Sequence, residues 1–169
     1  IGEWVLQEAC TKLKEWQDKY GLDRSFCVSV NVSSRQLAQS RFVERLKEIL
    51  DQTQLPPCCL ELELTESVLL QETNTTIEPL EGIRRLGVGL KIDDFGTGYS
   101  SLSYLHRLPF DMIKIDRSFI QRIANKPSSE PMIRTILSLA KGLGLEVVAE
   151  GIEDPQQLEC LRELGCQFG

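Results

Sequence analysis

Five aliphatic segments of the sequence each end in a polar or charged residue that could bind a metal ion or another charged ligand. Successive side chains of a β-strand point to opposite faces, so strands in these segments would form one aliphatic and one polar layer. The polar layer comprises Asn31, Glu63, Asp93, Lys114, Asp116 and Glu150. The aliphatic layer comprises Val28, Val30, Leu62, Leu64, Ile92, Ile113, Ile115 and Ala149. The pattern predicts a ring of ligands on one face of a sheet.

The polar layer carries an excess of negative charge. If these carboxylates lie close together at one end of the strands, with Lys114 as the only cation at a strand end, their mutual repulsion would raise several of the carboxyl pKa values. A divalent cation would relieve this repulsion, and oxygen ligands favour Mg²⁺ or Mn²⁺ over zinc. His106 is the only histidine in the chain. Adjacent Asp93 and Asp94 could bridge two cations roughly 3.5–4 Å apart, an arrangement used to cleave phosphate esters.

Each of these residues also has a simpler interpretation. Asp93 and Asp94 could begin a turn before Gly96, and Lys114 taken alone is typical of a salt-bridge partner. Carboxylates and a lysine at strand ends could also abstract a proton next to a carboxylate, as in enolase-like lyases. The agreement of five strand ends favours a ligand site, and from the residues alone the lyase stays an alternative.

Alternating strand and helix patterns predict an α/β fold with a parallel sheet, in one domain over residues 1–169. The strands are expected near 27–31, 60–65, 88–93, 112–116 and 146–150. A polar inner face favours a (β/α)8 barrel over an open doubly wound sheet. A first helix is expected to bury Val5, Leu6, Ala9, Leu13 and Trp16. A complete barrel takes about 250 residues, so we expect this one to be incomplete at both ends.

Composition excludes several classes of protein. The net charge of −6 opposes nonspecific binding to duplex nucleic acid or anionic lipid, and no segment is apolar enough to insert into a membrane. Without a signal peptide, a cytoplasmic location is expected. The six cysteines lack a CxxC pair, which predicts buried, reduced thiols.

Five stretches of the chain together closely resemble the EAL-domain family of bacterial phosphodiesterases, which hydrolyse cyclic di-GMP. They are residues 28–33 (VSVNVS), 63–67 (ELTES), 91–102 (KIDDFGTGYSSL), 113–116 (IKID) and 148–153 (VAEGIE). The resemblance implies a TIM-like barrel and Mg²⁺- or Mn²⁺-dependent cleavage of one phosphodiester bond, giving linear pGpG.

The resemblance also implies a role for each matching residue. Asn31, Glu63 and Asp93 resemble ligands of a first metal, and Asp93 and Asp94 resemble ligands of a second. Glu150 resembles a further carboxylate that binds metal or positions water. Lys114 would contact the nucleophilic water or the phosphate. Glu66 resembles the anchor of the DFGTG loop, and Asp116, Gly96, Gly98 and Glu153 are expected to serve the substrate or this loop.

Two family segments lie outside the matched stretches: the name-giving Glu-Ala-Leu before Ile1 and a last strand after Gly169. We therefore expect residues 1–169 alone to bind metal weakly and to have little activity. The alternative function is a cyclic di-GMP receptor without turnover. The resemblance further implies a homodimer formed through residues 94–102, and sensor or GGDEF domains elsewhere in the parent chain.

Overall fold

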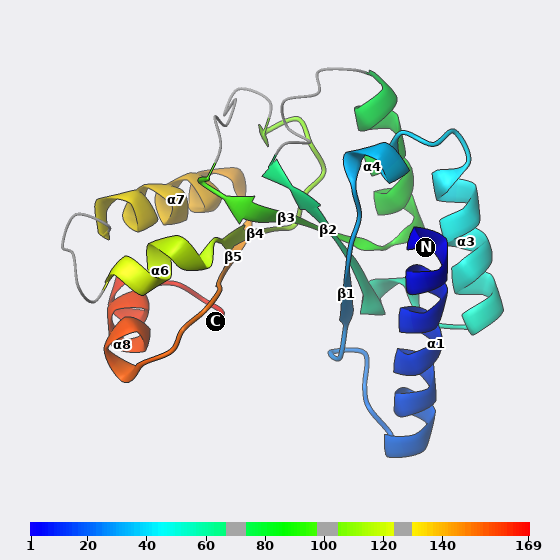
Figure 1. The fold of residues 1–169 in the computed structure, drawn as a ribbon, viewed down its shortest axis with the longest axis horizontal. Coiled ribbons are helices and arrows are strands. Elements are labelled where there is room, and N and C mark those ends of the chain that lie inside the picture. Colours follow the sequence, from blue (N-terminus) through cyan, green and yellow to red (C-terminus); the bar gives the residue numbers. More distant parts are fainter. Residues whose placement is uncertain (67–73, 98–104, 124–129) are drawn as a thin grey trace. The chain divides into compact units, whose positions relative to one another are not determined.

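The computed structural model describes residues 1–66, 74–97, 105–123 and 130–169 (Figure 1). Its residues divide into two compact units, each with helices packed on parallel strands. Unit 1 contains residues 1–64, 74–90 and 107–109, and unit 2 contains the other described residues. Strand β3 (Gly89–Phe95) begins in unit 1 and continues into unit 2. Among the described residues the sheet has five strands in the order β1-β2-β3-β4-β5.

Unit 1 places helices on the strands β1 (Val28–Asn31) and β2 (Leu60–Thr65). Helix α1 (Gly2–Tyr20) contacts β1 and α3 (Phe42–Thr53), and α4 (Asn74–Leu86) contacts α3 and α2 (Ser34–Leu37). A short 3-10 helix (Pro57–Cys59) leads into β2. The register aligns Val30 with Leu62 and Asn31 with Glu63, so each pair shares a face.

Unit 2 contains β4 (Met112–Ile115), β5 (Glu146–Ala149) and three helices. The helices are α6 (Arg117–Ile123), α7 (Glu130–Leu143) and α8 (Pro155–Leu164), coloured yellow to red in Figure 1. Helix α7 contacts both strands and both other helices. Asp154 accepts hydrogen bonds from Gln156 and Gln157 and, with Pro155 next to it, begins α8.

The predicted aliphatic layer is confirmed within each unit, with one residue less buried than expected. Val30, Leu62 and Leu64 are buried in unit 1, and Ile92, Ile113, Ile115 and Ala149 in unit 2. Val28 is only partly buried. Lys114, which alternates with Ile113 and Ile115, lies on the other face of β4.

Three predictions about the elements need correction. Helix α1 buries Leu6, Cys10 and Leu13, whereas Val5 is 38% exposed and Trp16 is 52% exposed. At 100° per residue, both lie at the flank of the buried stripe. Strand β3 continues past Asp93 to Phe95. All six cysteines are free as predicted, but only Cys10 and Cys59 are buried.

No helix among the described residues combines the length and apolar character that crossing a membrane requires.

Candidate active site

An ion-pair cluster on strands β3, β4 and the end of β5 forms the centre of the candidate site. The Lys114 Nζ atom lies 2.9 Å from Asp93 Oδ1 and 2.7 Å from Glu150 Oε1. The side chains of Lys114 and Asp93 are only 11% and 14% exposed, and that of Glu150 is 37% exposed. The structure thus brings together three of the predicted site residues, all within unit 2.

A β-bulge positions the two adjacent aspartates. Ile92 pairs with Ile113 but Phe95 pairs with Ile115, so β3 contains one residue more than β4 between these pairs. Asp94 has a φ of 55°, which is uncommon outside glycine. In a regular strand the two carboxylates would point to opposite faces, whereas a bulge re-aims side chains. Here the Asp94 N–H donates to Asp93 Oδ1 at 3.1 Å, the same oxygen that contacts Lys114.

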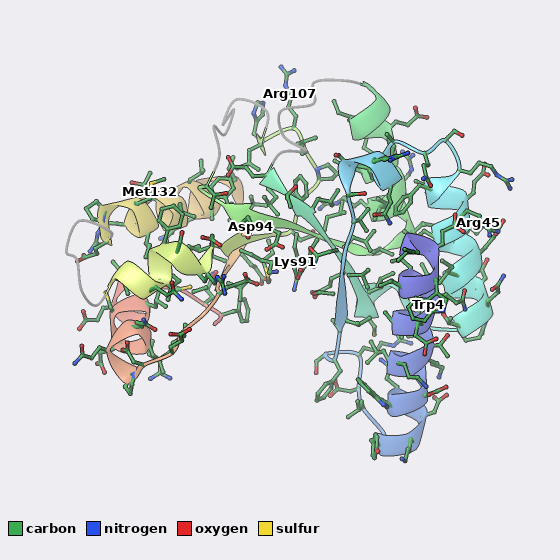
Figure 2. The ribbon with its side chains drawn as sticks, viewed as in Figure 1. Trp4, Arg45, Lys91, Asp94, Arg107 and Met132 are labelled. Carbon is green, nitrogen blue, oxygen red and sulfur yellow. The ribbon has the colours of Figure 1, made fainter. Side chains whose placement is uncertain are left out.

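The Asp94 side chain, labelled in Figure 2, lies near the other charges of the cluster. Partial desolvation is the main cause that raises its pKa above 3.8, although the residue is exposed overall. The negative charges of Asp93, Asp116 and Glu150 raise the pKa further, and Lys114 lowers it. The repulsion predicted from the sequence is therefore present at this residue.

Asp116 stabilises the start of helix α6. It follows the last residue of β4, and its Oδ1 accepts a hydrogen bond from the Ser118 N–H at 3.0 Å. Hydrogen bonding to Ser118 is the main cause that holds the Asp116 pKa below 3.8. The Asp116 charge therefore acts on the Asp94 carboxyl, while the Asp116 carboxylate itself is hydrogen-bonded to the backbone at the start of α6.

Glu66 contacts the loop after β3. Its side chain is buried, and Oε2 accepts a hydrogen bond from the Gly96 N–H at 2.9 Å. Gly96 has a φ of 96°, and a Cβ atom there would meet the Phe119 ring at 3.0 Å. Only glycine fits this turn without strain. The predicted site residue Gly98 lies outside the described residues, as do residues 99–102 of the predicted dimer segment.

Glu153 lies at the entry to helix α8. Its side chain is exposed, and its N–H donates to the Gln157 Oε1 atom at 2.7 Å. Gln157 is buried and also accepts from the Asp154 N–H. The buried Gln157 thus fixes the segment between Glu150 and α8, a contact that was not predicted from the sequence.

Asn31 and Glu63 lie side by side in unit 1, at the carboxyl ends of the strands β1 and β2. They are register partners on parallel strands and share one face. Glu63 is 7% exposed, while Asn31 is exposed. The Glu63 carbonyl accepts a hydrogen bond from the Val32 N–H at 2.8 Å, which fixes the backbone where β1 ends.

The residues of the cluster suit a hard divalent cation by their chemistry. All donors are carboxylate oxygens, and Asp93, Asp94 and Glu150 together bring more negative charge than the Lys114 ammonium balances. Within the described ranges, however, no three His, Cys, Asp or Glu residues are arranged as a ready-made metal site. The Lys114 ammonium lies between two of the carboxylates.

Gly151 is a further residue near the cluster, and the sequence alone predicts no role for it. It follows Glu150 and has a φ of 74°. The glycine directly after a strand-end carboxylate is the sequence signal that points to such a position.

The fold and the site define a parallel α/β protein with acidic and basic side chains at the carboxyl ends of its strands, and comparison with known proteins gives the family. The EAL domain family model matches residues 1–169. The chain is 45% identical over 168 residues to the cyclic di-GMP phosphodiesterase NbdA of Pseudomonas aeruginosa, covering 99% of this chain and 21% of that protein. It is 38% identical over 157 residues to the cyclic di-GMP phosphodiesterase PdeR of Escherichia coli, covering 93% and 23%.

Solved structures agree with the sequence matches. The phosphodiesterase PaMucR in complex with c-di-GMP superposes with a TM-score of 0.92 at 42% identity, covering 99% of this chain and 67% of that one. The EAL domain of Mycobacterium smegmatis DcpA gives 0.91 at 42% identity, covering 98% and 74%. The chain belongs to the EAL domain family, and the predicted fold class, an α/β fold of the TIM-like EAL type, is confirmed. It spans about a fifth of the length of the curated relatives reported above.

Proposed function

We propose that the protein hydrolyses cyclic di-GMP to linear pGpG with the help of a divalent metal ion. The observation that carries the proposal is the cluster of Lys114 with Asp93 and Glu150 at the carboxyl ends of parallel strands. Family membership and relatives that are named cyclic di-GMP phosphodiesterases support the substrate. A related phosphodiesterase was also solved with c-di-GMP bound.

Lys114 would stabilise negative charge in this reaction. Its ammonium is largely buried, so its field acts through a medium less polarisable than bulk water. Two carboxylates from different strands hold the Nζ atom, which keeps the charge in place before substrate binds. A preorganised cation of this kind favours the transition state, in which charge builds on phosphate oxygens.

Several of the predicted site residues would hold the metal. We propose Asp93, Asp94 and Glu150 as ligands because they lie near one another and Lys114, and we propose Asn31 and Glu63 on the likeness of their motifs to the family. The bound cation would be Mg²⁺ or Mn²⁺ in a site for two ions, and would supply an activated water and charge neutralisation. Glu66, Gly96 and Gly98 would shape the loop after β3, while Asp116 and Glu153 would support the substrate-facing segments.

The alternative is a receptor that binds cyclic di-GMP without cleaving it. One assay separates the two functions: the purified full-length protein is incubated with cyclic di-GMP and Mg²⁺ or Mn²⁺, and pGpG is followed by chromatography. Hydrolysis that stops on chelation and in Lys114→Met, but continues in the exposed control Lys141→Met, supports the enzyme. Binding without pGpG under all metal conditions supports the receptor.

The wider context of the domain is part of the proposal. We expect sensor or GGDEF domains in the full-length protein, since one relative is a bifunctional diguanylate cyclase and phosphodiesterase. We also expect a homodimer formed through residues 94–102 and a location in the cytoplasm. Light scattering of the purified protein tests the dimer, and cell fractionation tests the location.

A further inference from the structure

Gly151 lies where the chain leaves strand β5, directly after Glu150. Its φ of 74° belongs to the left-handed region that side chains disfavour. A Cβ atom on Gly151 would lie 2.8 Å from Arg117 Cβ and 3.6 Å from Arg117 Cα. The first distance is shorter than real Cβ contacts, so any side chain at this position would force the backbone to move.

Arg117 cannot yield to such a side chain by rotating. The close atom is its Cβ, which is bonded to the backbone and does not move when the side chain changes rotamer. Arg117 is also the first residue of α6, next to Asp116, whose carboxylate accepts from Ser118. The adjustment would therefore fall on the segment that contains Gly151 and Glu150.

Glu150 and Gly151 together contact three residues of the segment 114–117, where β4 ends and α6 begins. The Glu150 carboxylate contacts Lys114 Nζ at 2.7 Å, and the Glu150 N–H donates to the Ile115 carbonyl at 3.2 Å. Gly151 then lies against Arg117. All three contacts are with residues of the segment 114–117. A shift of the backbone at Gly151 would therefore also move the Glu150 carboxylate.

We propose that Gly151 is a positioning residue of the candidate active site: the absence of a side chain lets the chain lie on Arg117 and so holds the Glu150 carboxylate at Lys114. This inference rests on the proposed function, because it assigns Gly151 a role in the same reaction. A displacement of several tenths of an ångström at a reacting group lowers turnover strongly, since misplacement by about 1 Å can cost about 100-fold.

The experiment compares Gly151→Ala with Gly144→Ala in the full-length protein. Gly144 has a φ of 70° in the same unit, and nothing lies within 4 Å of a Cβ placed there. Both glycines have a similar positive φ, so the comparison of the two variants reports mainly the contact with Arg117. We expect Gly151→Ala to lower kcat for cyclic di-GMP by about tenfold to 100-fold with little change in KM, and Gly144→Ala to lower neither.

A double variant provides the rescue. Arg117→Gly removes the Cβ atom at 2.8 Å, so Arg117→Gly/Gly151→Ala is expected to recover the kcat of Arg117→Gly alone. Recovery would show that the effect of Gly151→Ala comes from the clash with the Arg117 Cβ atom and not from the positive φ at position 151. If Gly151→Ala does not fold, the double variant decides the question: a folded protein with the kcat of Arg117→Gly supports the proposal, and any other result overturns it.

A second readout does not depend on turnover. The Lys114 amine is shielded because its side chain is 11% exposed and two carboxylates hold it. Trace acetylation with acetic anhydride, quantified by mass spectrometry, should modify Lys114 severalfold faster in Gly151→Ala than in wild type or Gly144→Ala. Equal labelling in all three proteins overturns the positioning role. If the wild-type protein cleaves no cyclic di-GMP, the proposed function fails while the labelling still tests Gly151.

Discussion

The replacement of Lys114 by methionine is the most direct test of the cluster. Methionine keeps an unbranched side chain of similar length and removes the ammonium that contacts Asp93 and Glu150 at 2.9 and 2.7 Å. The carboxylates then face one another and the nearby Asp94 without this compensating charge. We expect Lys114→Met to destabilise the protein at neutral pH in the absence of divalent cations.

The magnitude follows from the burial of the partners. Removing one member of a buried ion pair typically costs about 3–5 kcal/mol, because the other charge stays buried. Lys114 and Asp93 are 11% and 14% exposed and fall in this class, but Glu150 is 37% exposed and is partly solvated. We therefore expect a loss near the lower end, about 3 kcal/mol in the free energy of unfolding.

Urea denaturation with a chelator present measures this loss. The matched control is Lys141→Met, which changes an exposed lysine in helix α7 of the same unit and should alter stability by no more than about 0.5 kcal/mol. Mg²⁺ or Mn²⁺ should stabilise Lys114→Met as a ligand of the native state, without restoring hydrolysis. If Lys114→Met and Lys141→Met unfold at the same urea concentration with equal slopes, the cluster is a solvated surface contact and the reasoning is refuted.

Three further predictions follow from individual contacts. Glu66→Ala removes the buried acceptor of the Gly96 N–H and should cost about 1.5–3 kcal/mol in urea denaturation, whereas Glu66→Gln, which keeps an acceptor oxygen, should cost less. Asp116→Ala should cost about 1 kcal/mol at pH 7. Because the folded pKa of Asp116 is lowered, its stabilisation is present above the unfolded pKa of 3.8, so the wild-type advantage should fade as the pH drops through the folded pKa. Burial raises the Cys10 pKa to about 11, so iodoacetamide at pH 8 should spare Cys10 in the native protein while modifying exposed Cys27 and Cys58.

The sequence predicted the layers of the sheet because strand alternation is a short-range property. Leu62 and Leu64 are buried as the alternation requires, and so are Ile113 and Ile115 with Lys114 between them on the other face. Helix starts depend on equally short-range contacts, because the capping residues Ser33 and Asp154 act within three positions of their own backbone.

Features that depend on neighbouring strands could not be predicted in this way. The bulge at Asp93 and Asp94 exists because β3 and β4 differ by one residue between their paired positions, which neither strand reveals alone. Likewise, Lys114 had two interpretations before the structure was known, as a salt-bridge partner and as a site residue. The structure shows the ion pairs with Asp93 and Glu150, and these pairs are compatible with both.

The presence of an aspartate at position 94 is explained by the chemistry of the candidate site rather than by the stability of the fold. The Asp94 φ of 55° is a conformation in which glycine would fit with less strain. Its carboxyl is partly desolvated among Asp93, Asp116 and Glu150, so its charge is repelled in the folded state. The ionised Asp94 carboxylate is therefore disfavoured on balance by its surroundings in the fold, and a cationic ligand of the site would give it a favourable interaction.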